Sequence, residues 1–153
     1  MKQEGMVHAL EEIHRLLTPG GELLDIHPVP TETAVQVVLN GAVLFAEASP
    51  DHDHLEEEQA EDALAQVVRR GLFVIERSEE FTFHVYGSSV VELVDFMAEA
   101  NAFDAGNSND EAVTTQKEEL YARVEEVVHA AGEEAEVVYL ERGRIARLKP
   151  LRS

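Results

Sequence analysis

Apolar residues recur with helical spacing in several segments of the chain. Met6, Leu10 and Ile13 follow the i, i+3, i+4 pattern that makes one apolar stripe along an amphipathic helix. Ser89 and Glu92 have the spacing of a capping box, which satisfies free backbone N–H groups at the start of a helix. By these criteria four helices are predicted, at residues 6–17, 55–70, 89–100 and 115–131.

Shorter runs rich in β-branched and aromatic residues predict the strands. Residues 34–39 and 42–47 flank Asn40-Gly41, a pair preferred in two-residue hairpins because both turn residues need a positive φ angle. Other strands are predicted at 22–27, at 72–77 and 80–86 around Ser78-Glu79, and at 137–140 and 144–148, which form a closing pair or one bent strand.

This alternation of helices and strands predicts an α+β protein with a single domain, residues 1–153. The polar segments 49–54 and 104–110 are predicted to be loops, because turn-forming residues gather there between periodic segments. The chain shows neither an internal repeat nor a low-complexity linker that would mark a domain boundary.

Charge is abundant and unevenly placed. The chain has 31 Asp and Glu against 12 Lys and Arg residues, a formal net charge of −19, which argues against binding to nucleic acid. Residues 142–153 contain five basic residues and no acidic one. This basic tail indicates charge pairing within or between chains, or the solvated face of a last strand; of the two we favour the solvated face.

The composition of the chain also argues against cysteine-based sites, membrane insertion and export. The chain has no cysteine, so it has no disulfide, thiolate metal site or cysteine nucleophile. No apolar stretch is long enough to span a bilayer, so a membrane partner is not expected. Residues 1–5 lack the apolar core of a signal peptide, and a cytoplasmic location is therefore expected.

One short string is specific enough to suggest a family. Leu17, Pro19, Gly20 and Gly21 follow a helix and precede the strand Glu22–His27. This arrangement resembles the C-terminal half of class I S-adenosylmethionine-dependent methyltransferases, in which such a turn leads into the fifth strand. The resemblance implies a partial Rossmann-like sheet, made of the late strands with antiparallel hairpins and packed with three to four helices.

The same resemblance implies that the cofactor-binding half of the fold is missing. In that family the methyl donor sits on a glycine-rich loop after the first strand, and no G-x-G sequence occurs in this chain. No catalytic or cofactor-binding residue can therefore be carried over from the family. S-adenosylmethionine is expected to bind only if a partner supplies the missing half.

Two groups of polar residues are candidates for a site. Asp25, His27, His84 and Tyr86 lie on predicted strands and are assigned to a candidate substrate cleft. Asp51-His52-Asp53-His54 contains potential metal ligands at dense spacing. We favour a polar loop in which Asp53 caps the next helix, and no metal site is assigned.

Three functions are compatible with these features. The first is a methyltransferase-like protein that is inactive alone and acts as an interaction or oligomerising module. The second is the substrate-side half of a split methyltransferase, and the third is a non-enzymatic protein that binds a small ligand or metal. Because the strand Glu22–His27 would lack a neighbour, we expect a second copy or a partner protein to cover its edge.

Overall fold

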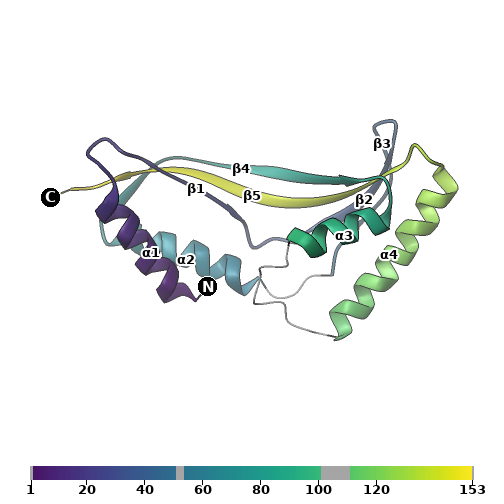
Figure 1. The fold of residues 1–153 in the computed structure, drawn as a ribbon, viewed down its shortest axis with the longest axis horizontal. Helices are drawn as coiled ribbons and strands as arrows, with labels where there is room; N and C mark the ends of the chain where they lie inside the picture. The colour runs from purple at the N-terminus through teal and green to yellow at the C-terminus, as the bar shows by residue number, and fades with distance from the viewer. Residues whose placement is uncertain (1, 51–53, 101–110, 153) are drawn as a thin grey trace. The chain divides into compact units, whose positions relative to one another are not determined.

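A computed structural model describes residues 2–50, 54–100 and 111–152 of the chain. In this part the protein is α+β, with four helices and a five-stranded antiparallel sheet, which confirms the predicted α+β class and the four predicted helices; a Rossmann-like sheet stays a prediction. Figure 1 shows the course of the chain. The elements are α1 (Gln3–Leu16), β1 (Leu23–Pro28), β2 (Ala34–Leu39), β3 (Ala42–Ala48), α2 (Leu55–Arg69), β4 (Phe73–Gly87), α3 (Val90–Ala100), α4 (Glu111–Ala131) and β5 (Glu136–Pro150).

The last strand, β5, is the centre of the sheet. The strand order is β1-β5-β2-β3, and β4 also pairs with β5. The C-terminal half of β5 pairs antiparallel with β1, and its N-terminal half pairs antiparallel with β2. β1 therefore has one strand neighbour among the described residues.

The chain forms two compact units. Unit 1 comprises Met1–Thr31, His54–Thr82 and Arg142–Ser153, and unit 2 comprises Glu32–Asp53 and Phe83–Glu141. The assignment of all 153 residues to one domain stays a prediction.

Unit 1 packs α1 and α2 against one side of its strands. Its core is built from α1, α2, the start of β4 and the C-terminal half of β5; its buried residues are Val7, Ala63, Leu64, Val67, Phe73, Ala146 and Leu148. We call the side of the sheet that carries Ala146 and Leu148 the inner face of unit 1, and the opposite side the outer face. Successive residues of a strand alternate between these faces.

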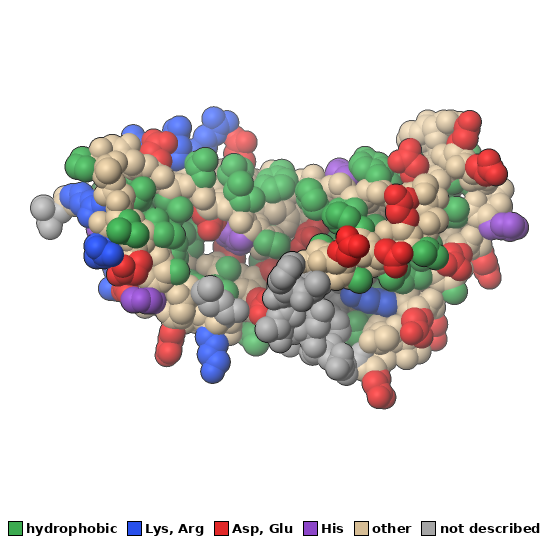
Figure 2. Space-filling view, viewed as in Figure 1, with side chains coloured by type: hydrophobic (Ala, Val, Ile, Leu, Met, Phe, Trp, Pro, Cys, Tyr) green, Lys and Arg blue, Asp and Glu red, His purple; other side chains and the backbone are tan. Residues whose placement is uncertain are grey.

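Unit 2 has its own core. α4 packs on β2 and β3, and α3 packs on α4. The buried residues of this core are Val35, Val37, Val90, Leu93, Leu120, Val124, Ala135, Val137 and Tyr139. Acidic side chains cover much of the visible surface of α3 and α4 (Figure 2).

Local signals placed several chain reversals correctly. Asn40 and Gly41 both have positive φ angles, 50° and 80°, as the hairpin prediction required. Gly71 follows α2 with a φ angle of 74°, and its N–H donates to the carbonyl of Val68. At the start of α3, the N–H of Glu92 donates to Ser89 Oγ at 3.1 Å, so that cap is confirmed.

The prediction of two strands around Ser78-Glu79 was wrong, because β4 runs without interruption from Phe73 to Gly87. The side chains of Glu76 and Glu80 nevertheless contact opposite faces of unit 1. Residues four apart in a regular strand share a face, so the alternation shifts by one position between them. The polar pair Ser78-Glu79, which predicted a turn, therefore lies in the segment where the side chains of β4 shift from one face of the sheet to the other.

The start of α4 also differs from the sequence-based expectation. α4 begins at Glu111, so Thr115 lies inside the helix and does not cap it. β5 is one strand, which agrees with one of the two alternatives for residues 137–148. The predicted loop Asp104–Asp110 lies outside the described residues.

No helix in the described part of the chain has both the length and the apolar character needed to cross a bilayer.

Candidate functional site

β1 places its polar and apolar side chains in an unexpected direction. Asp25 and His27 point to the inner face, where helices cover the sheet, and both are partly buried. Leu24 and Ile26 point to the outer face and are 61% and 62% exposed. A strand in a sheet covered on one side ordinarily turns its apolar residues toward the covered side. Leu23 follows this rule and packs against the core of unit 1, but from Leu24 to His27 the strand has the reverse arrangement.

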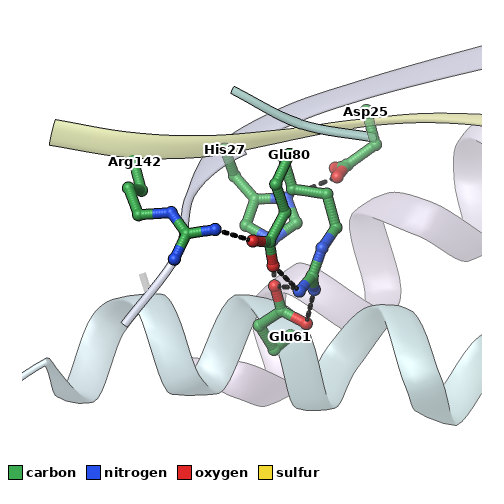
Figure 3. Close-up of polar contacts among 6 residues, drawn as sticks. Asp25, His27, Glu61, Glu80 and Arg142 are labelled. Atoms are coloured by element: carbon green, nitrogen blue, oxygen red, sulfur yellow. Dashed lines mark hydrogen bonds and ion pairs between the residues drawn. The ribbon is translucent and has the colours of Figure 1, made fainter. Parts of the chain in front are cut away.

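His27 joins β1 to α2 on the inner face. Its Nδ1 lies 2.5 Å from Asp25 Oδ2 and its Nε2 lies 2.8 Å from Glu61 Oε1. Figure 3 shows the carboxylate of Glu61 rising from the helix toward the ring. The His27 side chain is only 11% exposed, so both hydrogen bonds are partly shielded from water.

These two hydrogen bonds require a charged imidazole. Ionised carboxylates only accept hydrogen bonds, so a ring that contacts one at each nitrogen must donate from both and carry a positive charge. The hydrogen bond with Asp25 is the main cause that raises the pKa of His27 above its ordinary value, and Glu61 adds to the shift. Partial burial opposes it, because it disfavours the charged form.

Arg144 of β5 completes the cluster. Its guanidinium group forms an ion pair with Glu61 and another with Glu80 at 2.8 Å, so it links α2 to β4. Arg142 also pairs with Glu80, as Figure 3 shows. The hydrogen bond with Arg144 and the charge of Arg142 lower the pKa of Glu80. We call Asp25, His27, Glu61, Glu80, Arg142 and Arg144 the inner cluster.

The outer face of unit 1 is apolar at its centre. Ile26 lies directly opposite Ile145 in the antiparallel pairing of β1 with β5. Next to them, the ring of Phe81 covers Gly143, where an added Cβ would lie 2.7 Å from Phe81 Cζ. Phe81 is 39% exposed. We call Leu24, Ile26, Ile145 and Phe81 the outer patch.

Charged residues of both signs border the outer patch. Glu76 pairs with Arg147 at 3.1 Å and with Lys149 at 2.8 Å, and Lys149 also lies 3.9 Å from Glu22. The hydrogen bond with Lys149 is the main cause that lowers the pKa of Glu76. In Figure 2, Lys and Arg side chains lie beside hydrophobic ones over the strands of unit 1. The rim of the patch is thus mixed in sign.

The basic tail is engaged inside unit 1. Four of its five basic residues form the ion pairs given above, and the fifth, Arg152, donates to the carbonyls of His14 and Leu17 at 2.5 and 2.7 Å. His14 Nε2 in turn lies 2.9 Å from the carbonyl of Leu151. The tail therefore makes internal pairs, the alternative that we did not favour, although several of its side chains are also half exposed.

A shallow hollow of about 420 Å³ lies beside the inner cluster. It is lined by Val29, Pro30, Thr31, Glu58, Glu61, Asp62, Glu80 and Arg144. The buried Oγ1 of Thr31 has no hydrogen-bond partner in the structure. Among the described residues, no group of three or more His, Asp or Glu side chains is arranged to hold a metal ion. Asp51–Asp53 of the potential metal-binding loop lie outside those residues.

The four residues assigned to a candidate cleft form two separate pairs. Asp25 and His27 contact each other in unit 1. His84 and Tyr86 belong to unit 2, where their rings stack with centroids 6.1 Å apart. That all four line one cleft stays a prediction.

The family turn lies where it was expected, between α1 and β1. Leu17 follows the last residue of α1. Gly20 has a φ angle of 85°, and the N–H of Gly21 donates to the carbonyl of Thr18 at 2.8 Å. A Cβ on Gly21 would lie 3.0 Å from that carbonyl oxygen. The positive φ angle of Gly20 and the close approach at Gly21 both favour glycine at this reversal.

Sequence reasoning missed Glu61 and Arg144 as site residues. One signal for Glu61 was available, because it lies three residues before Leu64 and seven before Val68 on the apolar stripe of α2. A carboxylate on such a stripe needs a partner, since burying an unpaired charge is costly. No local sequence pattern distinguished Arg144 from the other four basic residues of the tail.

A scan against protein-family models, a search of curated proteins and a search of solved structures each returned no match.

Proposed function

We propose that this protein is an interaction module that presents the outer face of unit 1 to another polypeptide. The observation that carries the proposal is the outward direction of Leu24 and Ile26 on β1, both of which are more than 60% exposed. Exposed apolar patches that are rimmed by polar residues mark surfaces for association. The outer patch with its mixed rim has this character.

The inner cluster supports the proposal, because it holds β1 in the register that exposes its apolar residues. A slip of one residue would turn every side chain of the strand to the opposite face. It would bury Leu24 and Ile26, but it would also remove His27 from Glu61. The charged contacts on the inner face thus favour apolar exposure on the outer face.

A relation to the late strands of methyltransferases is part of the proposal. It is supported by the turn from Leu17 to Gly21 at the entry to β1, and by the pairing of β4 with the last strand, β5. On this reading the chain lacks the half that binds the methyl donor. Calorimetric titration of the protein with S-adenosylmethionine should give no heat of binding, and micromolar affinity would overturn the relation as stated.

Cysteine labelling tests the interaction function directly, because the chain has no native cysteine. Ile26→Cys places a thiol on the outer patch, and Val43→Cys places one on β3 of unit 2, where the native side chain is 54% exposed. Each variant is produced at native level in the cells that make this protein and treated with a maleimide. The purified variants, diluted until they are monomeric, give the reference rate.

We expect the thiol at position 26 to react more slowly in cells than in the dilute reference, while the thiol at position 43 reacts at the same rate in both. Such protection would mean that a polypeptide covers the outer patch. Equal reaction at position 26 in both settings would overturn the proposed function.

A further inference from the structure

We infer that the outer patch binds the outer patch of a second copy of this chain, in a symmetric dimer. The inference rests on the proposed function and names its partner. In a two-fold dimer the same surface is used by both copies, so the surface must be complementary to itself. Two features of unit 1, its charge and the layout of its outer face, meet this requirement.

The charge of the protein is concentrated away from unit 1. Unit 1 contains 10 of the 12 Lys and Arg residues but only 13 of the 31 Asp and Glu residues, so its formal charge is −3. The remaining 2 basic and 18 acidic residues give unit 2 a formal charge of −16. Like charges oppose association, so two copies meet least repulsion through unit 1.

The rim of the outer patch carries equal numbers of opposite charges. Glu22 and Glu76 contribute two acids, and Arg147 and Lys149 contribute two bases. A partner that is strongly basic or strongly acidic would leave one sign unmatched. These charges already pair within one copy, so two such rims meet without adding a net charge of either sign to the interface.

The centre of the patch is suited to close packing between two sheets. The cross-strand pair Ile26–Ile145 is flanked by Leu24 along β1 and by Phe81 of β4. Two sheets that pack face to face bury such side chains between them at a spacing of about 10 Å. Removing these apolar groups from water is the main favourable term expected for the dimer.

Sedimentation equilibrium of the purified full chain tests the inference. We expect a monomer–dimer equilibrium whose dissociation constant rises roughly tenfold or more in the double variant Leu24→Lys, Ile26→Lys, because two buried apolar side chains per copy are replaced by charges. The matched control is Val43→Lys, Leu44→Lys, whose native side chains on β3 are 54% and 49% exposed. This control should dimerise like the wild type.

A cross-link shows which faces meet. In the dimer, a short bis-maleimide should join Ile145→Cys to its copy, and should not join Val43→Cys to its copy. Equal weakening by both lysine pairs, or cross-linking at position 43 alone, would overturn the inference. A chain that stays monomeric at all concentrations would also overturn it. In that case, protection of position 26 in cells would still support the proposed function, with a different polypeptide as partner.

Discussion

His27 Nε2 donates to Glu61 Oε1 at 2.8 Å, which fastens the inner face of β1 to α2. The contact joins residues 34 positions apart and requires a charged imidazole. It also determines which side chains of β1 remain outside, since Ile26 must then point away from the helices. A polar contact on one face of the strand is thus linked to the apolar surface on the other.

The stability of the protein should depend on the protonation of His27. Its folded-state pKa is raised, so its stabilising contribution is present in full below the unfolded value of about 6.5 and is lost as pH rises through the folded value. His27→Gln should lower the free energy of unfolding by about 1–3 kcal/mol near pH 6, and by less at pH 9. Urea denaturation of both proteins across this range measures the difference.

His8→Gln provides the control for that experiment. His8 is on α1, its side chain is 74% exposed, and its nearest acidic partner, Glu11, lies 3.8 Å away. We expect its unfolding free energy to follow the wild type at every pH. A His27→Gln variant that retained the full pH dependence of the wild type would assign that dependence to another group.

Arg144 should stabilise unit 1 by separating two carboxylates. It pairs with Glu61 and Glu80 together, so Arg144→Met leaves these acids facing each other without their shared cation. We expect a loss of about 1–3 kcal/mol in the free energy of unfolding, with partial recovery when Glu80→Gln is added. Thermal and urea unfolding of the single and double variants measure both effects.

Arg123→Met is the matched control for Arg144. It removes one exposed pair on unit 2, between Arg123 and Glu47 at 2.7 Å, and exposed pairs contribute little to stability. We expect no measurable change. If both variants lost the same stability, the loss could not be attributed to the inner cluster.

Local sequence signals were sufficient for elements whose geometry depends on neighbouring residues. The Asn40-Gly41 turn follows from the φ angles that a two-residue hairpin needs, and α1 follows from apolar periodicity. Ser78-Glu79 shows the limit of this reasoning. Two polar residues between apolar runs resemble a turn, but pairing with β5 keeps them within one strand.

The candidate site was only partly predictable, because its contacts join distant segments. Asp25 and His27 stand out as polar residues at alternate positions of an apolar strand. Arg144 reaches Glu61 across 83 positions, and they meet only because β5 pairs with β1 and α2 packs against β1. The reverse arrangement within β1 depends on the same pairing, so the sequence pattern alone did not reveal it.

Arg152 should hold the C-terminal segment against the end of α1. It donates to the carbonyls of His14 and Leu17. The last carbonyls of a helix lack a backbone N–H donor, because no further helical turn follows them. We expect Arg152→Ala to cost about 1 kcal/mol and to speed amide hydrogen exchange at Leu151, whose N–H donates to Leu72 at 2.8 Å. Arg152→Lys should recover part of the loss. Unchanged exchange at Leu151 would show that Arg152 does not hold the segment.

Salt should strengthen the dimer. The two copies carry −19 each, and raising the NaCl concentration from about 0.05 M to about 0.5 M shortens the range of their repulsion without weakening apolar contacts. The dissociation constant should therefore fall over this range. A variant with four exposed acids of α4 replaced by Gln, at Glu118, Glu119, Glu125 and Glu126, should dimerise more tightly at low salt and respond less to NaCl. Weakening of the wild-type dimer by salt would instead mean that ion pairs between the copies outweigh their overall repulsion.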